Sequence, residues 1–199
     1  MNLQLCNTER KTLYRLLAAL FRYPEQGLLD SLSLSLQKTS AFLNLPLPAD
    51  TNQVPELIDL EVAYTGLFIN CLGGAAAPPY GSVYLESDAQ LMGSSCLQVV
   101  ESYRSEGLNL DASDEPADFL ATELEFLYYL VAEEEGAENS AVALGWKKKQ
   151  GDFSRELLHP WLKEFCQRIE QTSGVHPLYA WAAEALLQFS ELEQNYFSR

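Results

Sequence analysis

Basic residues are scarce in the middle of this 199-residue chain. Between positions 39 and 146, eighteen Asp and Glu residues accompany one basic residue, Arg104, whereas the rest of the chain carries ten acids and twelve bases. The net charge of −15 therefore arises in this stretch. Such a one-sided field repels nucleic acid and attracts cations, which argues against nucleic acid as a partner and indicates a basic peptide. The alternative is a solvated acidic surface that only keeps the protein in solution.

The few histidines and cysteines of the chain do not form the patterns that indicate a metal site or a disulfide. The chain has two histidines and four cysteines, and no Cys-x-x-Cys pair occurs. Neither a zinc site nor a disulfide framework is predicted, and the thiols are expected to be free and buried. Glu156 and His159 form one Glu-x-x-His unit, but di-iron helix bundles use two such units together with two further glutamates. The cysteines are Cys6, Cys71, Cys96 and Cys166.

Signatures of catalysis are absent as well. The glycine-rich segment LGGAAAPPYGS at 72–82 lacks the lysine and the spacing of a phosphate-binding loop. No Ser-His-Asp or Cys-His spacing signature appears. Glu123 and Glu125 lie on adjacent helical turns that aim them differently, so we expect solvation or a salt bridge for them rather than acid–base chemistry. These absences predict a protein that is not an enzyme and that needs no cofactor or metal.

Long apolar runs are missing too. No segment reaches the roughly 18 to 20 uncharged apolar residues of a membrane span, and the first residues, MNLQLCNTERKTLYRLL, do not have the pattern of a secretory signal. The sequence therefore predicts a cytoplasmic protein without stable membrane insertion. Because 47% of the residues are hydrophobic and 11% aromatic, the chain can bury one sizeable core. We predict a single domain over residues 1–199.

Hydrophobic residues follow helical spacing along almost the whole chain. In the first stripe, Leu13, Leu16 and Leu20 follow a Thr8 N-cap, and Pro24 ends the helix. Strand-like alternation does not occur, so the predicted fold is all-α, a single-domain helical bundle of roughly eight to eleven helices. The other predicted helical segments are 26–43, 57–68, 88–104, 116–131, 153–169 with a break or kink at Pro160, and a final helix after Pro177.

Two segments are predicted to be irregular. The segment AAAPPYGSVYLESD at 75–88 contains Pro78 and Pro79, which remove backbone donors and restrict the residue before each proline. We expect a rigid loop that carries aromatic side chains. Residues 108–115 form a polar connection between two helical halves, and we predict a hinge there. Such a hinge would permit domain swapping, so the protein is expected to be a monomer or a domain-swapped dimer.

Several short motifs occur together in one order along the chain: YTGLF at 64–68, APPYGSVYLE at 77–86, EPAD at 115–118, PW at 160–161 and HPLY at 176–179. In this combination the chain resembles the TorD/DmsD family, which is related to NarJ. Its members are cytoplasmic chaperones that mature molybdenum-containing anaerobic oxidoreductases and bind their twin-arginine signal peptides. The resemblance covers nearly the whole chain and implies a single all-helical chaperone domain.

The resemblance also implies where a signal peptide would bind. A twin-arginine peptide presents two guanidinium groups followed by an apolar run, so its receptor needs carboxylates and an apolar aromatic groove. The alternative is structural: residues 64, 67 and 68 share helical spacing typical of a core, and an acid in a first helical turn favours the helix dipole. The implied peptide-binding residues are Tyr64, Leu67, Phe68, Pro79, Tyr80, Tyr84, Glu115, Asp118 and Phe119.

One of these positions departs from the family motif. Members usually read Glu-Pro-x-Asp-His, whereas this chain has Phe119 in place of the histidine, and phenylalanine has no donor, acceptor or titratable group. A second family histidine corresponds here to Leu157. These changes indicate a different client or a more apolar groove.

The function implied is that of a system-specific chaperone. It would bind the twin-arginine leader of a molybdoenzyme precursor and assist cofactor insertion and folding before Tat export. Its partners would be the precursor of the catalytic subunit, its leader peptide and components of the Tat translocase. Two alternatives remain: an adaptor that binds the folded apoenzyme, and a protein that holds the molybdenum cofactor or a nucleotide.

Overall fold

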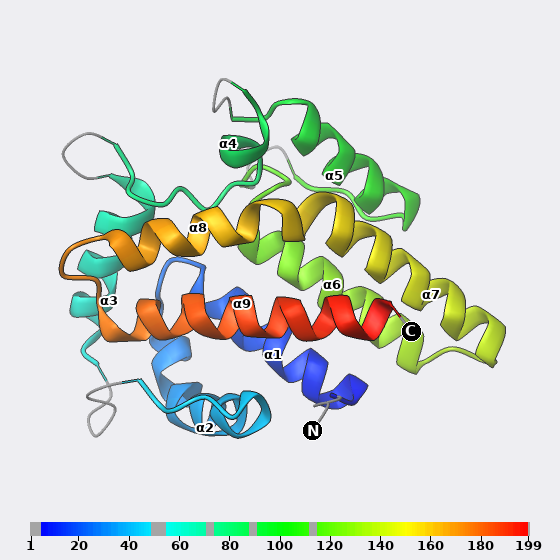
Figure 1. The fold of residues 1–199 in the computed structure, drawn as a ribbon, viewed down its shortest axis with the longest axis horizontal. Helices are drawn as coiled ribbons and strands as arrows, with labels where there is room; N and C mark the ends of the chain where they lie inside the picture. Colours follow the sequence, from blue (N-terminus) through cyan, green and yellow to red (C-terminus); the bar gives the residue numbers. More distant parts are fainter. Residues whose placement is uncertain (1–4, 49–54, 71–73, 88–90, 112–114, 199) are drawn as a thin grey trace.

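The computed structural model describes residues 5–48, 55–70, 74–87, 91–111 and 115–198, and this part of the chain is built from helices without a strand (Figure 1). The predicted all-α fold class is thus confirmed. The elements are α1 (Asn7–Leu20), α2 (Gln26–Leu43), α3 (Leu57–Tyr64), a π-helical turn η1 (Thr65–Ile69), α4 (Ser82–Leu85), α5 (Ser94–Ser105), α6 (Leu120–Glu135), α7 (Ser140–Phe153), a second π-helical turn η2 (Ser154–Leu158), α8 (His159–Gln171) and α9 (Pro177–Phe197).

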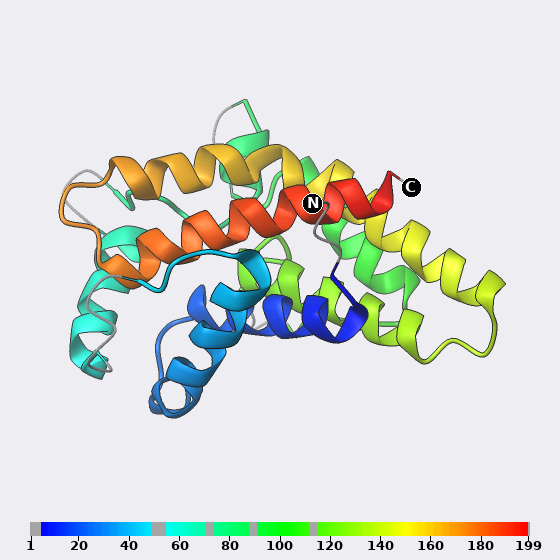
Figure 2. The same cartoon turned by 60° about the horizontal axis from the view of Figure 1, so that its bottom comes forward.

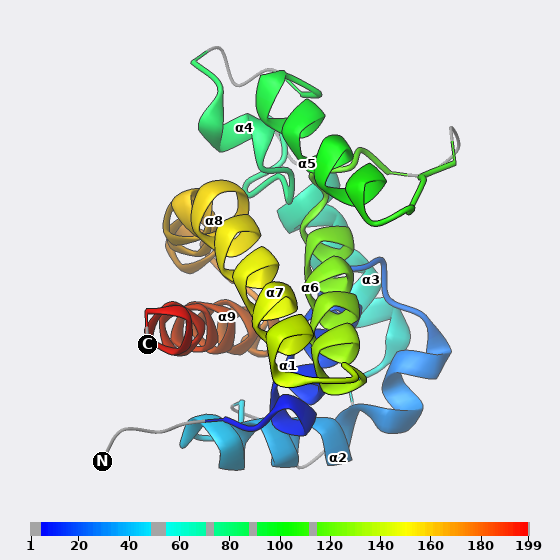
Figure 3. The same cartoon turned by 90° about the vertical axis from the view of Figure 1, so that its right-hand side faces the viewer.

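Helix α6 is the centre of the bundle and packs against α1 and α7 (Figure 3). Leu120, Leu124, Leu127 and Val131 share one face of α6 and are at most 1% exposed. Burying a side chain of this kind stabilises the fold by about 1.5–3 kcal/mol. The predicted apolar stripe of the central helix therefore anchors the bundle.

The remaining helices surround this centre. Helix α9 packs on α8 and on α1, and α2 packs along the outer side of α1 (Figure 2). Helices α4 and α5 lie on the opposite side of the bundle from α2, where α4 contacts α8 (Figure 3). The loop that carries α4 is thereby placed above the beginning of α6 and the side of α8.

The break predicted at Pro160 separates α7 from α8. Proline has no amide hydrogen, and its ring clashes with the carbonyl four residues earlier, so a regular α-helix cannot continue through it. The chain accommodates Pro160 with the π-helical turn η2, in which the amide of His159 donates to the carbonyl of Ser154, and Pro160 occupies the first turn of α8. The prediction of a break is confirmed.

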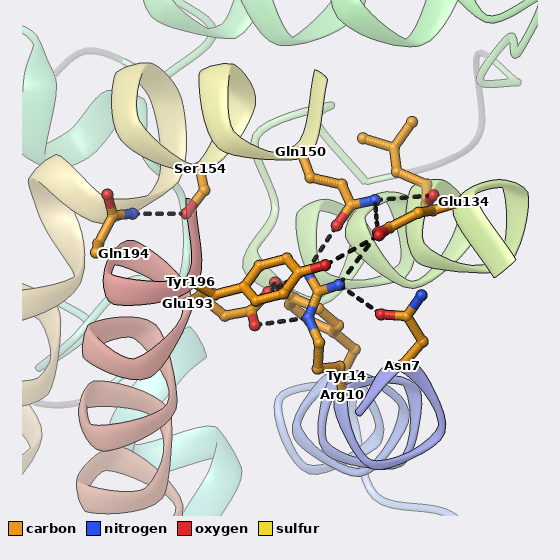
Figure 4. A network of polar contacts seen from close by, with 10 residues as sticks. Asn7, Arg10, Tyr14, Glu134, Gln150, Ser154, Glu193, Gln194 and Tyr196 are labelled. Carbon is orange, nitrogen blue, oxygen red and sulfur yellow. Dashed lines mark hydrogen bonds and ion pairs between the residues drawn. The ribbon is translucent and has the colours of Figure 1, made fainter. Parts of the chain in front are cut away.

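A buried polar network joins α1, α6, α7 and α9 (Figure 4). The fully buried Arg10 donates from Nε and Nη2 to the two carboxylate oxygens of Glu193, both at 2.7 Å. It also donates to Gln150 at 2.6 Å and to Glu134 at 3.3 Å, and the Tyr14 hydroxyl donates to Glu193 at 2.6 Å. Because a buried charge is tolerated only when it is paired, the four helices must meet in the register that brings these groups together.

The helices differ from the predictions at the starts of α1, α5 and α6, and α7 occupies residues 140–153, for which no helix was predicted. Helix α1 begins at Asn7 with Cys6 at the N-cap, and Thr8 lies inside the helix, because Glu9 accepts a hydrogen bond from the Cys6 amide. Helix α5 begins at Ser94 rather than at 88, and residues 88–90 lie outside the described part. Helix α6 begins at Leu120 rather than at 116. The predicted irregular loop contains one short helix, α4, whereas α2 has the predicted bounds 26–43.

The expectation of free thiols holds for the cysteines that the structure describes. Cys96 and Cys166 are buried and free, but Cys6 is free and exposed, so its predicted burial is wrong. Cys71 and part of the predicted hinge, residues 112–114, lie outside the described residues. Within the described ranges, no helix has both the length and the apolar content to cross a membrane.

Candidate functional site

Three of the implied site residues belong to an aromatic core cluster at the junction of α3 and η1. Tyr64, Leu67 and Phe68 are 3–5% exposed, and the Tyr64 hydroxyl donates to the carbonyl of Phe21 at 3.1 Å. Phe68 contacts the rings of Tyr64, Phe165 and Tyr179. In this conformation these side chains pack inward, as the structural alternative predicted.

The loop at 78–86 docks onto the segment that precedes α6. Tyr80 and Phe119 form an isolated antiparallel bridge: the Gly81 amide donates to the Asp118 carbonyl at 3.0 Å, and the Leu120 amide donates to the Pro79 carbonyl at 2.9 Å. This pairing uses extended backbone at Phe119, which explains why α6 begins four residues later than predicted. Two segments about forty residues apart in the sequence are thereby held together.

Asp118 reinforces this docking with its side chain. Its carboxylate is 1% exposed, and Oδ2 accepts a hydrogen bond of 2.7 Å from the Ser82 amide at the beginning of α4. Burial, aided by the neighbouring Asp118, raises the pKa of the Cys96 thiol to about 11, so that thiol is neutral at physiological pH. Asp118 lies before α6 rather than in its first turn, so the alternative that placed it at the helix dipole is wrong. It fastens the loop to the bundle.

At the rim of the docked loop, the Tyr80 hydroxyl donates to Glu115 Oε2 at 2.8 Å, and Glu115 is exposed. The ring of Tyr80 lies 5.5 Å from that of Phe119. Partial burial, and then the hydrogen bond and charge of Glu115, raise the pKa of Tyr80, so its phenol remains a neutral donor. The exposed carboxylate of Glu115 and the half-buried Tyr80 therefore lie together at the rim, above Phe119, which is 3% exposed.

Tyr84 holds the other end of the loop against α8. Its ring stacks on Trp161 with centroids 5.4 Å apart and planes 17° apart, and its hydroxyl donates to the Pro78 carbonyl at 2.8 Å. The guanidinium of Arg168 lies 4.6 Å from the centre of the Tyr84 ring. Gly81 also abuts the indole: a Cβ there would lie 2.9 Å from Trp161 Nε1. The loop is thus a close-fitting cover over α8.

Arg22, which the sequence did not single out, lies beside this rim. Its Nε and Nη2 donate to the two carboxylate oxygens of Glu125 at 2.9 and 2.6 Å, and its guanidinium carbon lies 5.8 Å from the centre of the Phe119 ring. The hydrogen bond to Glu125 raises the pKa of Arg22, and the charge of Glu115 contributes in the same direction. The expected salt bridge of Glu125 is confirmed. The partners are 103 positions apart, so no local pattern revealed the pair.

Beneath the loop, Glu123 lies in the core with both carboxyl oxygens unpaired. Asp118 Oδ1 and Trp161 Nε1 are also buried without a hydrogen bond. Burial, with a smaller contribution from the charge of Asp118, raises the pKa of Glu123 well above its ordinary value. The nearby indole N–H of Trp161 acts in the opposite direction and lowers this pKa slightly, although it does not reach hydrogen-bonding geometry. The expectation of a solvated or salt-bridged Glu123 is wrong, because this residue faces the core between Asp118 and α8.

The structure thus divides the implied residues into two groups. Pro79, Tyr80, Tyr84, Glu115, Asp118 and Phe119 come together where the loop meets the start of α6, and Tyr64, Leu67 and Phe68 lie in the adjoining core. Within the described ranges, no cluster of three His, Cys, Asp or Glu side chains has the geometry to hold a metal ion.

Comparisons with known proteins agree with this architecture. A solved structure of an Archaeoglobus fulgidus protein assigned as a redox enzyme maturation protein superposes with a TM-score of 0.55 over 96% of this chain and 94% of the other, at 24% sequence identity. That likeness shows the fold. The family described as the nitrate reductase delta subunit matches residues 25–167.

Two curated relatives are similar along much of the chain. A protein named chaperone protein TorD from Psychrobacter is 30% identical over 87% of this chain and 86% of its own length. A TorD from Vibrio cholerae is 29% identical over 72% of this chain and 64% of its own length. The chain therefore belongs to the nitrate reductase delta subunit family and, within it, to the TorD-like chaperones. This is a family of chaperones and not of enzymes.

Proposed function

We propose that this protein is a maturation chaperone that binds the twin-arginine leader of a molybdoenzyme precursor at the rim of the docked loop. By holding the leader, it would delay Tat export until the cofactor is inserted and the enzyme has folded. The Tat translocase would then receive the released precursor. Membership in the TorD-like family supports the chaperone role, and the residues around Phe119 support the choice of ligand.

The observation that carries this proposal is the position of the Arg22 side chain. A guanidinium group already lies there between the Glu125 carboxylate and the Phe119 ring, with exposed Glu115 nearby. Bidentate carboxylate pairing combined with an aromatic face is the arrangement that favours arginine over lysine. A leader that presents two neighbouring arginines could use the same chemistry, with one guanidinium at Glu115 and the other at Glu125.

Exchange of Arg22 for a leader arginine would cost little. The side chains of Arg22 and Glu125 are 44% and 50% exposed, and an ion pair this exposed contributes only about 0–1 kcal/mol. The apolar run of the leader would lie along Tyr80 and the loop. Asp118 and the core cluster of Tyr64, Leu67 and Phe68 would then support the site from beneath rather than touch the peptide.

Calorimetric titration with a synthetic twin-arginine leader and its twin-lysine variant tests the proposal. We expect saturable binding that weakens with the lysine variant. The double variant Glu115→Gln/Glu125→Gln should weaken leader binding by about tenfold, since each lost charge-assisted contact is worth about 1 kcal/mol or less at an exposed rim.

Glu101→Gln/Glu138→Gln is the matched control, because both residues are exposed acids elsewhere in the same acidic stretch and the net charge changes equally. It should change affinity by less than about twofold. If the rim variants bind the leader as tightly as wild type does, the leader is recognised at another surface. A protein that binds the folded apoenzyme but no isolated leader would instead be the adaptor considered above.

A further inference from the structure

A groove lies between α1 and α2 and reaches Arg22, the residue beside the rim of the docked loop. It encloses about 530 Å³ and is open to solvent. Residues of α1, of the connection that follows it and of α2 line this groove. Its size is within the range of sites that hold several side chains of a ligand.

The charge of the groove is opposite to that of the molecule. Three cationic side chains line it, Arg15, Arg22 and Lys38, against one acid, Glu25. The whole chain carries 28 acids and 13 Lys and Arg residues, so this local excess of positive charge runs against the composition. Among the described residues, the exposed Arg15 and Lys38 have no ion-pair partner, whereas Arg22 already binds Glu125. Two cations are therefore available to a ligand.

The floor of the groove is apolar and its rim is polar. Leu16 is 5% exposed at the floor, where Ala19 and Leu28 also line the groove. Hydroxyl groups of Thr12, Ser31 and Ser35 lie along the same lining. At the amino end of α2, Glu25 makes no side-chain cap, and Gly27 in the first turn lines the groove. The partial positive charge of a helix amino terminus adds to that of the cations.

From this arrangement we propose that the α1–α2 groove is a second interaction surface, which docks an acidic segment of a partner protein. The segment would place an apolar side chain on Leu16 and Leu28 and carboxylates against Arg15 and Lys38. A site for a small phosphate compound would need cations buried around one point, whereas these cations are exposed and spread along a groove with an apolar floor. The groove shares Arg22 with the rim proposed for the leader, whereas the cations that this proposal uses, Arg15 and Lys38, belong to the groove and not to that rim.

The test uses a fluorescent synthetic peptide of about twelve residues that contains only Glu and Leu, with Leu at every third or fourth position to form an apolar stripe. The double variant Arg15→Glu/Lys38→Glu should weaken binding of this probe by at least about tenfold. Arg104→Glu/Lys163→Glu is the control: it reverses two exposed cations outside the groove and changes the net charge equally, and it should weaken binding by less than about twofold.

Equal losses in the two double variants would overturn the proposal, since attraction would then depend on net charge alone. Displacement of the probe by inorganic phosphate at matched ionic strength would reassign the groove to small anions. Self-association of the wild type that Arg15→Glu/Lys38→Glu abolishes would assign it to a second copy of the chain, whose acidic middle has the complementary charge. The twin-arginine leader should bind the groove variant as it binds Arg104→Glu/Lys163→Glu, which has the same net charge, so failure of either proposal is seen separately.

Discussion

The side chain of Arg22 makes contacts that an arginine of a bound peptide would also make. It pairs with Glu125 through two hydrogen bonds and faces the Phe119 ring. If the proposed leader site is correct, Arg22 competes with the leader for the same carboxylate. The strength of that competition is set by an exposed ion pair and is therefore small.

Arg22→Ala should accordingly tighten leader binding, by up to about fivefold, because the leader no longer has to displace an internal guanidinium. Calorimetric titration measures the change. Arg104→Ala removes the same charge from another exposed position and corrects for the altered net charge. Weaker leader binding in Arg22→Ala than in Arg104→Ala would mean that Arg22 assists the site instead of occupying it.

Glu123 gives a prediction about pH. An unfolded Glu titrates at about 4.3, whereas burial raises the pKa of Glu123 in the folded protein. Between these two values the folded state binds more protons than the unfolded state, so this residue makes stability fall as pH rises through that window. Glu123→Gln cannot ionise and should be more stable than wild type, by a margin that is larger at pH 8 than at pH 5.

Thermal unfolding followed by circular dichroism at the two pH values measures that margin, and Glu125→Gln serves as a control on an exposed acid of the same helix. A margin that does not change between pH 5 and pH 8 would show that folding does not raise the pKa of Glu123, so its carboxyl would be ionised in the core at both pH values.

At the scale of the element, the loop at 78–86 depends on a close approach that only glycine permits. A Cβ on Gly81 would lie 2.9 Å from Trp161 Nε1 and 3.3 Å from Trp161 Cε2, and the indole is held by its stack with Tyr84. Gly81→Ala should therefore destabilise the protein by about 1–3 kcal/mol.

Urea unfolding measures the effect of Gly81→Ala. Gly145→Ala is the matched control, because a Cβ at this exposed position inside α7 meets nothing within 4 Å. It should stabilise the protein by about 0.5–1 kcal/mol through helix propensity. Equal stability of the two variants would imply that the loop can move away from α8 without loss.

The elements also show what sequence reasoning can and cannot find. The bounds of α2 and the break at Pro160 follow from periodicity and from the chemistry of proline, both of which are local. The start of α6 does not, because a bridge to Tyr80 holds Phe119 in extended backbone. The position of the Arg22 side chain and the burial of Glu123 likewise depend on residues that are distant from them in the sequence. Resemblance pointed to the loop that docks onto the start of α6, whereas the packing of Phe68 inward required the structure.

For the molecule as a whole, the network around Arg10 connects helices from both ends of the sequence. Glu193→Ala would leave the buried guanidinium with only its weaker partners, and removing one member of a buried pair costs about 3–5 kcal/mol. We expect this loss in urea unfolding, against less than about 0.5 kcal/mol for the exposed Glu191→Ala. Similar stabilities of the two variants would show that Gln150 and Glu134 are sufficient partners for Arg10.

Charge is also organised at this scale. The acids collect between 39 and 146, whereas the α1–α2 groove is lined by cations. The two proposed sites adjoin at Arg22, which lines the groove and pairs with Glu125 at the rim, so a leader with arginines and a partner segment with carboxylates would bind next to each other. A chaperone with two such surfaces could hold the leader and another part of the same client together, which raises the effective concentration at the second contact.

The stack of Tyr84 on Trp161 gives the protein a built-in optical reporter. Trp161 is 1% exposed, so its indole emits from an apolar environment as long as the loop covers it. In a background where Trp146 and Trp181 are replaced by phenylalanine, the emission would come from this indole alone. A ligand that lifts the loop would then shift the emission to longer wavelength, and a ligand that only occupies the rim would leave it unchanged. Opening of the cover and occupation of its edge could thus be followed separately in real time without an added label.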